Sequence, residues 1–140
     1  MTLLDLTYSW INFIPENAFE FNENFEQHFT IDLRFNVYLN NSGFSEHCLT
    51  KLKRPTTINI DNNNNNYYFP YLEEKIFQSF LGTNCKNQIK LTDGSLDCSD
   101  CRNYWLKKDP ALLKKVIFSK CSNGKVFNDT ENFKNCSSYL

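Results

Sequence analysis

The sequence predicts an α/β fold in which short parallel strands stack side by side in a solenoid, with helical connections on the convex side. Three observations predict it: an apolar-x-apolar segment that recurs every 27 to 31 residues, an amphipathic stretch between two of these segments, and a cluster of cysteines near the C-terminus. The 140 residues suit one domain. The formal net charge of −1 argues against a strongly basic nucleic-acid-binding surface.

The recurring segments begin at Leu4, Ile31, Ile58 and Ile89, so the steps between them are 27, 27 and 31 residues. Each begins apolar-x-apolar, which is a minimal strand with two side chains on one face. A period of this length is typical of solenoids, in which each unit buries its apolar face against its neighbours. We therefore expect the four segments to pair side by side in one parallel sheet.

The segments resemble the leucine-rich repeat, whose core is L-x-x-L-x-L-x-x-N-x-L. Asn36 and Asn63 occupy the asparagine position, where a buried amide can bond backbone groups that the sharp turn leaves unpaired. Ser9 and Gly94 stand there in the other two segments, and Asn65 replaces the last apolar residue of the third. The resemblance implies a leucine-rich-repeat solenoid of about four repeats over residues 1–96.

The connections between the strands are compatible with helices. Residues 71–81 place apolar side chains at 72, 76, 77, 80 and 81, the stripe of an amphipathic helix, and Gly82 fits its C-terminal stop. A shorter helix is expected over 45–52, ending before Pro55. Residues 64–66 of the asparagine run are interpreted as a solvated extension.

Four cysteines follow the last strand with the spacing C-x2-C-x19-C-x14-C, at Cys98, Cys101, Cys121 and Cys136. A reduced, zinc-binding intracellular protein is one interpretation, although zinc ribbons usually show two close ligand pairs and here the last two cysteines stand singly. Disulfides in an oxidising compartment are the other interpretation. The spacing alone leaves three disulfide connectivities open.

The cysteine cluster with Trp105 and Leu106 resembles the C-terminal cap of secreted leucine-rich-repeat proteins, which covers the apolar edge of the last repeat. That resemblance makes residues 97–140 a cysteine-rich cap. It implies two disulfides, Cys98 with Cys121 and Cys101 with Cys136. Cys48 and Cys85 remain, either as a bridge between adjacent coils or as two free thiols that behave as small apolar residues.

Several motifs narrow the resemblance to arthropod proteins of this family, mite proteins especially, which are usually described as similar to the oplophorus-luciferin 2-monooxygenase non-catalytic subunit. The resemblance covers the C-terminal two-thirds well and residues 1–50 loosely. It implies a non-catalytic binding role, or alternatively an accessory subunit of an oxidoreductase complex. The motifs are residues 52–55, 62–64, 73–77, 80–81, 98–106 and 121–125.

The sequence favours binding over catalysis. His28 and His47 belong to no nucleophile motif, and four scattered glycines form no phosphate loop, so we expect no enzyme activity, cofactor or metal site. Residues that project from the concave strands would bind a protein or other macromolecule; aromatic residues with an arginine are typical interface anchors, though the aromatic rings could instead pack within the sheet. The expected binding residues are Asp5, Tyr8, Asp32, Arg34, Phe35, Asn59, Asp61 and Lys90.

The sequence also gives an expectation about where the protein is located relative to the cell. The first residues show neither a basic nor a continuous apolar region of a signal peptide, and no apolar stretch is long enough to span a membrane. Asn40 and Asn128 begin glycosylation triplets, which agrees with secretion. We therefore expect a secreted protein of which this chain is the C-terminal fragment. An uncapped repeat edge at Leu4 and Leu6 would then promote self-association.

Overall fold

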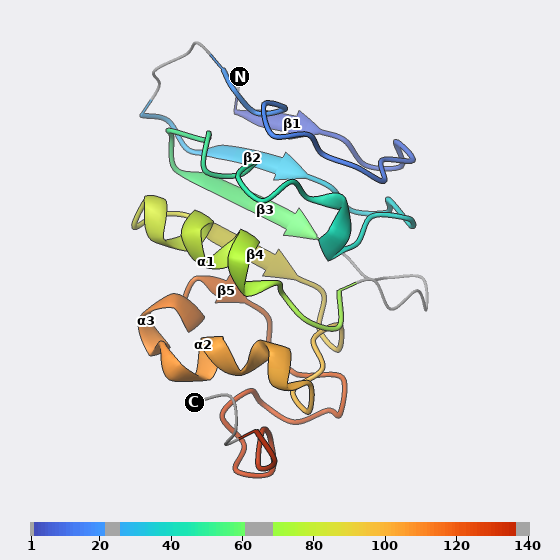
Figure 1. Cartoon of the computed structure of the whole chain (residues 1–140), viewed down its shortest axis with the longest axis vertical. Helices are drawn as coiled ribbons and strands as arrows, with labels where there is room; N and C mark the ends of the chain where they lie inside the picture. The colour runs from blue at the N-terminus through green and yellow to red at the C-terminus, as the bar shows by residue number, and fades with distance from the viewer. Residues whose placement is uncertain (1, 22–25, 61–68, 137–140) are drawn as a thin grey trace.

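The computed structural model describes residues 2–21, 26–60 and 69–136. These form an α/β fold around one parallel sheet with the strand order β1-β2-β3-β4-β5, so neighbours in sequence are neighbours in the sheet (Figure 1). Within these ranges, no helix has the length and apolar character that crossing a membrane requires. The strands are β1 (Leu3–Asp5), β2 (Phe29–Asp32), β3 (Thr56–Ile60), β4 (Gln88–Leu91) and β5 (Val116–Ile117).

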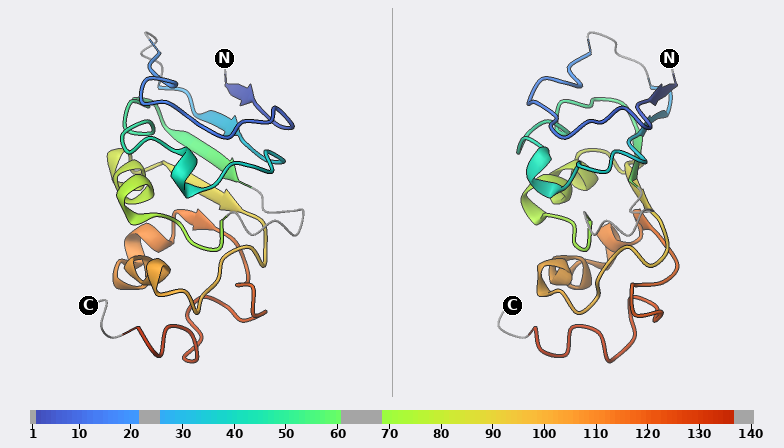
Figure 2. Two further views of the ribbon diagram at one scale, coloured as in Figure 1. Left: turned by 45° about the vertical axis from the view of Figure 1, so that its right-hand side comes forward. Right: turned by 90° about the vertical axis from the view of Figure 1, so that its right-hand side faces the viewer.

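The register of the sheet is the one that the recurring segments predict. Leu4 lies beside Ile31, Ile31 beside Ile58, and Ile58 beside Ile89. The three isoleucines are completely buried, so each strand contributes the same position to the core. Parallel strands need a crossover connection. The helices α1, α2 and α3 of these connections lie on the same side of the sheet (Figure 2).

The fifth strand comes from the cysteine-rich segment and was not expected. Val116 pairs with Ile89, and Ile117 pairs with Lys90. The segment therefore adds a strand to the exposed edge of β4 as well as covering the end of the core. Covering a free strand edge in this way removes a row of unpaired backbone groups.

The helix α1 (Glu74–Thr83) lies where the amphipathic stretch predicts it and buries its apolar side chains against the sheet (Figure 1). The prediction that Gly82 stops the helix is wrong, because α1 continues through it and ends before Asn84. A lysine from the cap segment takes over part of the C-terminal capping. The Lys115 ammonium donates a 2.7 Å hydrogen bond to the carbonyl of Leu81 and so satisfies an unpaired group of the last turn.

The predicted helix over 45–52 is also wrong. After the 3₁₀ helix η1 (Asn41–Gly43) the chain winds through successive turns, with the Cys48 amide donating to the Ser45 carbonyl and the Leu52 amide to the Leu49 carbonyl. These bonds span three residues instead of the four that an α-helix needs. The turns still bury Leu49 and Leu52 in the core, as a helix would have done.

Buried asparagines join the coils. Asn87 shows the arrangement: its side-chain oxygen accepts from the Thr56 amide and its nitrogen donates to the Phe80 carbonyl, both at 2.8 Å. One amide thus satisfies a donor and an acceptor that the turns leave without a backbone partner. The role expected for Asn36 is confirmed, whereas Asn63 and Asn65 lie outside the described residues. The buried asparagines are Asn36, Asn41, Asn87, Asn103 and Asn132.

The cap segment packs at the end of the stack of strands and contains three short helices, η2 (Cys101–Asn103), α2 (Tyr104–Lys108) and α3 (Pro110–Leu113). Trp105 is buried and donates a 2.9 Å hydrogen bond from its indole nitrogen to the Leu72 carbonyl. Two disulfides close the segment, with the pairing that the resemblance implies, and they leave none of its four thiolates available to zinc. The pairs are Cys98–Cys121 and Cys101–Cys136.

Of the two alternatives for Cys48 and Cys85, the structure has the free thiols and no bridge. Cys48 is completely buried and Cys85 is exposed. The register explains the difference. Ile58 pairs with Ile89, yet Cys48 precedes Ile58 by ten residues and Cys85 precedes Ile89 by four, so the two thiols occupy different points of adjacent coils. Cys48 instead acts as a small apolar core residue.

Alkylation of the native, unreduced protein with iodoacetamide is expected to label Cys85 and spare Cys48. Burial raises the pKa of the Cys48 thiol to about 11, so its reactive thiolate is scarce at neutral pH. Peptide mass spectrometry measures both labels, and unfolding in urea without reductant should make both thiols reactive. Failure to label either thiol after unfolding would show that they are bridged.

Candidate functional site

Four of the expected binding residues lie side by side across the sheet. Asp5 is beside Asp32, Asp32 beside Asn59, and Asn59 beside Lys90. Successive side chains of a strand point to opposite faces. The residues next to these four are aliphatic side chains that pack in or against the core, so the four share the face away from α1. We call them the polar row. Ile117, which is exposed, continues the row on β5.

The polar row changes its charge from one end to the other. Its two carboxylates lie on β1 and β2, a neutral amide lies on β3, and the ammonium of Lys90 lies on β4. The whole chain follows the same trend: residues 1–96 carry 7 basic and 11 acidic side chains, and residues 97–140 carry 8 basic and 5 acidic ones. A surface of this kind orients a charged ligand along the stack of strands.

An ion pair between Asp32 and Arg34 lies at the acidic end of the polar row. Arg34 donates from Nε to Asp32 Oδ1 at 2.8 Å and from Nη2 to Asp32 Oδ2 at 2.7 Å. The hydrogen bond from this guanidinium lowers the pKa of Asp32, outweighing its burial. In Asp5 the hydrogen bond from the Thr7 hydroxyl, helped by the Thr7 amide, lowers the pKa of the carboxyl in the same way. Both carboxyls are therefore charged at neutral pH.

Aromatic side chains stand on the turns that follow β1 and β2; Tyr8, Trp10 and Tyr38 are exposed and Phe35 is half-buried. Tyr8 and Phe35 stack with ring centroids 4.5 Å apart and planes 8° apart, and Trp10 lies 6.0 Å from Tyr38. Tyr8 is 69 % exposed and Trp10 70 % exposed. The rings thus contact one another and still face solvent. We call these four residues the aromatic turns.

Three of these side chains sit on left-handed backbone, with φ of 54° at Tyr8, 56° at Trp10 and 64° at Phe35. Bulky residues rarely adopt this conformation, which costs about 1 to 3 kcal/mol at each position. The surrounding structure must therefore hold them there. Strain of this kind concentrates at ligand sites, so it marks the aromatic turns as a candidate site.

Asn36 is the residue that holds both turns. Its side-chain oxygen accepts from the amides of Ser9 and Ile11 at 3.1 and 2.9 Å, and its nitrogen donates to the carbonyls of Leu6 and Leu33 at 2.8 and 2.9 Å. Three of these partners belong to the turn after β1, which carries Tyr8 and Trp10. The amide thus fixes one aromatic turn against the next.

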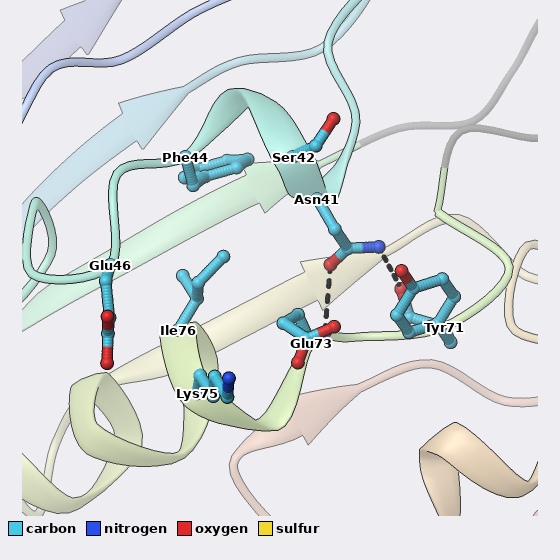
Figure 3. Close-up of a pocket in the computed structure, with 8 residues that line it drawn as sticks. All are labelled: Asn41, Ser42, Phe44, Glu46, Tyr71, Glu73, Lys75 and Ile76. Carbon is cyan, nitrogen blue, oxygen red and sulfur yellow. Dashed lines mark hydrogen bonds between the residues drawn. The ribbon is translucent and has the colours of Figure 1, made fainter.

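A hollow of about 350 Å³ lies on the opposite side of the molecule from the aromatic turns, between η1 and α1 (Figure 3). Asn41 spans it, but its amide is already engaged with the Tyr71 carbonyl and the Glu73 backbone amide. Ser42 likewise donates its hydroxyl to the Asn40 side chain. Among the residues that line this hollow, no nucleophile is hydrogen-bonded to a general base. The lining is Asn41, Ser42, Phe44, Glu46, Tyr71, Glu73, Lys75 and Ile76.

The remaining predicted residues are dispersed. Asp61 lies outside the described residues. Asn128 is exposed, whereas Asn40 is half-buried and its side chain accepts hydrogen bonds from Ser42. His28 lies 2.6 Å from the Thr57 hydroxyl through Nε2. Over the ranges that the structure describes, no group of three His, Cys, Asp or Glu side chains could hold a metal ion.

Sequence reasoning missed part of the aromatic turns. The missed members are Trp10 and Tyr38. Trp10 and Val37 stand 27 residues apart, as do Tyr8 and Phe35, so the repeat spacing contained a signal that predicts Trp10 beside the turn after β2. The left-handed backbone had no such signal, because aromatic residues favour other conformations. Ile117 was missed because β5 is only two residues long.

Comparisons of the chain with family models, with curated proteins and with solved structures find no significant match. The resemblance to leucine-rich-repeat proteins therefore stays a hypothesis based on motifs. Any functional conclusion has to rest on the residues and the geometry described above.

Replacing Asp32 with Asn is expected to lower the free energy of unfolding by about 1 kcal/mol at pH 7, since the ion pair with Arg34 is partly exposed. Because folding lowers the pKa of Asp32, the pair stabilises the fold above the unfolded pKa of about 3.9, and the contribution is lost as the pH falls through the lower folded value. Urea unfolding of both proteins across this range measures the difference. Glu16→Gln, at an exposed position of the first coil, is the control, and a difference that stays constant with pH would contradict this role.

Replacing Asn36 with Ala is expected to cost about 3 kcal/mol, because several backbone groups lose their partner at once. Equilibrium urea unfolding measures the cost. The exposed Asn12 provides the matched control, since Asn12→Ala should change stability by less than about 0.5 kcal/mol. Equal effects of the two substitutions would show that the amide bridge is not what stabilises the turns.

Proposed function

We propose that this chain is a non-catalytic, extracellular binding module of the leucine-rich-repeat type, and that the sheet face away from α1 binds a protein ligand. The observation that carries this proposal is the polar row: Asp5, Asp32, Asn59 and Lys90 lie in one line on that face. The carboxylate of Asp5 and the ammonium of Lys90 are exposed, and the buried carboxylate of Asp32 is paired with the exposed Arg34. Such a line offers a protein surface several charged and polar partners at the strand spacing of about 4.8 Å.

Three features support the repeat architecture. The strands pair in sequential order with offsets of 27, 27 and 31 residues. Asn36 bonds its own turn and that of the preceding coil. The cap segment closes the end of the stack with a buried tryptophan and two disulfides. Solenoids require such a cap, because the last unit otherwise exposes its apolar edge.

Two features support binding at the sheet face. The bidentate Asp32–Arg34 pair fixes an otherwise flexible arginine, which reduces the conformational entropy that a partner would have to overcome. Arginine and exposed aromatic residues are also the side chains most often found at the energetic centres of protein interfaces. Phe35 follows Arg34 in the sequence and lies under its guanidinium, and Tyr8 stacks on Phe35 from the preceding coil.

The disulfides support the extracellular location. Cys98–Cys121 and Cys101–Cys136 close loops of 23 and 35 residues, and each loop closure stabilises a fold by about 3 to 4 kcal/mol. Bridges of this kind persist in secreted proteins and are rare in reducing compartments. We infer from this that the protein works outside the cell.

Replacing Lys90 with Glu is expected to weaken ligand binding at least fivefold, which corresponds to about 1 kcal/mol at an interface residue. The immobilised wild-type protein captures a partner from the extracellular fluid of its source, and biolayer interferometry then compares the variants. Lys86→Glu is the matched control, because Lys86 is equally exposed but lies on the turn after α1. A partner that tolerates Lys90→Glu and is lost with Lys86→Glu would place the binding surface elsewhere.

A further inference from the structure

We propose that a small aromatic cavity beside the polar row binds a quaternary ammonium group. The cavity is lined by Tyr8, Trp10, Phe35 and Val37 and has a volume of about 120 Å³. Pockets for drug-sized ligands measure about 300 to 1,000 Å³, so this one suits a single compact group. The site adds a ligand to the protein surface proposed above and does not require that surface to bind a protein.

The lining is suited to a cation. Three of its four side chains are aromatic, and the faces of such rings attract cations electrostatically, with tryptophan giving the strongest attraction. The molecule already shows one such contact, since the Arg34 guanidinium lies 5.8 Å from the centroid of the Phe35 ring. A ligand cation in the cavity would meet Trp10, whose ring is largely exposed, and the stacked pair Tyr8 and Phe35.

The surrounding charge also favours a cation. Asp5 and Asp32 are ionised and Arg34 neutralises one of them, which leaves a net charge of −1 at the ends of the two strands that lead into the aromatic turns. An anion would be repelled by the remaining carboxylate of Asp5, whereas a cation gains from it. The attraction is long-range and weakens with salt.

The nature of the lining distinguishes a quaternary ammonium from a lysine-type ammonium. A primary ammonium is strongly hydrated and carries three hydrogen-bond donors, which lose free energy when they enter an apolar site without acceptors. The phenol of Tyr8 is the one side-chain acceptor among the four lining residues. A methylated ammonium has no N–H donor to satisfy, so it keeps its charge without that cost.

The cavity is preformed. Asn36 bonds the backbone on both sides of it, and the left-handed backbone at Tyr8, Trp10 and Phe35 holds the rings at their places. A site that is ordered before binding does not have to spend binding free energy on ordering. A preformed cation site would give the left-handed backbone at three neighbouring aromatic residues a role in binding.

Titration with choline, followed by tryptophan fluorescence, tests the proposal. The chain has two tryptophans, and Trp105 is only 4 % exposed while Trp10 faces solvent, so a ligand in the cavity changes the emission of Trp10. The neutral isostere 3,3-dimethyl-1-butanol has the same shape without the charge. We expect choline to bind about three- to fivefold more tightly, the contribution of a cation–π contact at an exposed site. Equal affinity would overturn the proposal.

Variants locate the site. Tyr8→Leu keeps an apolar side chain but removes one ring, and should weaken choline binding about threefold. Phe13→Leu is the matched control, because Phe13 is an exposed aromatic residue of the same coil that does not line the cavity. Arg34→Gln removes a competing positive charge and should strengthen choline binding. Equal effects of Tyr8→Leu and Phe13→Leu, or weaker binding by Arg34→Gln in a variant with an unchanged unfolding midpoint, would overturn the proposal.

A quaternary ammonium could be a free solute or the head group of a lipid, and co-sedimentation with phosphatidylcholine vesicles separates the two sources. Vesicle binding that choline competes away supports the lipid head group. Choline binding without co-sedimentation supports the free solute. If neither occurs, the cavity does not bind this chemistry, while the Lys90→Glu experiment on the protein ligand remains a separate test of the polar row.

Discussion

Buried amide side chains are the interaction on which the rest of this molecule depends. Each strand has only two to five residues, so strand pairing satisfies a small part of the backbone and the turns between strands must find other partners. An asparagine amide carries both a donor and an acceptor, and Asn36 and Asn103 use both to join one coil to the next. Aspartate lacks the donor and leucine lacks both, so only an amide of this size meets the need.

The same amides link the fold to the candidate site. The backbone of the aromatic turns is unfavourable by itself, and four hydrogen bonds offset that cost: two that the Asn36 side chain accepts and two that it donates. The rings of Tyr8 and Phe35 consequently stand stacked in solvent before any ligand arrives. A side chain that a simple repeat interpretation treats as structural therefore also fixes the geometry of the candidate site.

The sequence predicted the features that have a periodic pattern, namely the pairing of the strands and the helix α1. The pairing of Ile31 with Ile58 and Ile89 followed from the period, because a slip of one residue would turn the buried side chains to solvent, and α1 followed from a stripe of apolar residues. Features that have no periodic pattern in the sequence were not predicted. Val116 and Ile117 form too short a strand to recognise, and the conformation of the aromatic turns opposes the residues' own preference. The sequence left a bridge or free thiols open at Cys48 and Cys85, because bridging depends on where each thiol lies around its coil, which sequence spacing does not fix.

The two proposed surfaces share one end of the sheet, and this has a consequence for how a ligand would bind. Asp5 and the aromatic turns lie at β1 and β2, whereas Lys90 lies at β4, followed by the exposed Ile117 of β5. A macromolecule that covers the polar row therefore meets acidic and aromatic groups at one side and basic and aliphatic groups at the other. Reversing the ligand would place like charges together, which costs several kcal/mol in interfaces. For the proposed ligand the order of the strands would thus set the direction of binding, and the cap segment would take part in it because β5 extends the row.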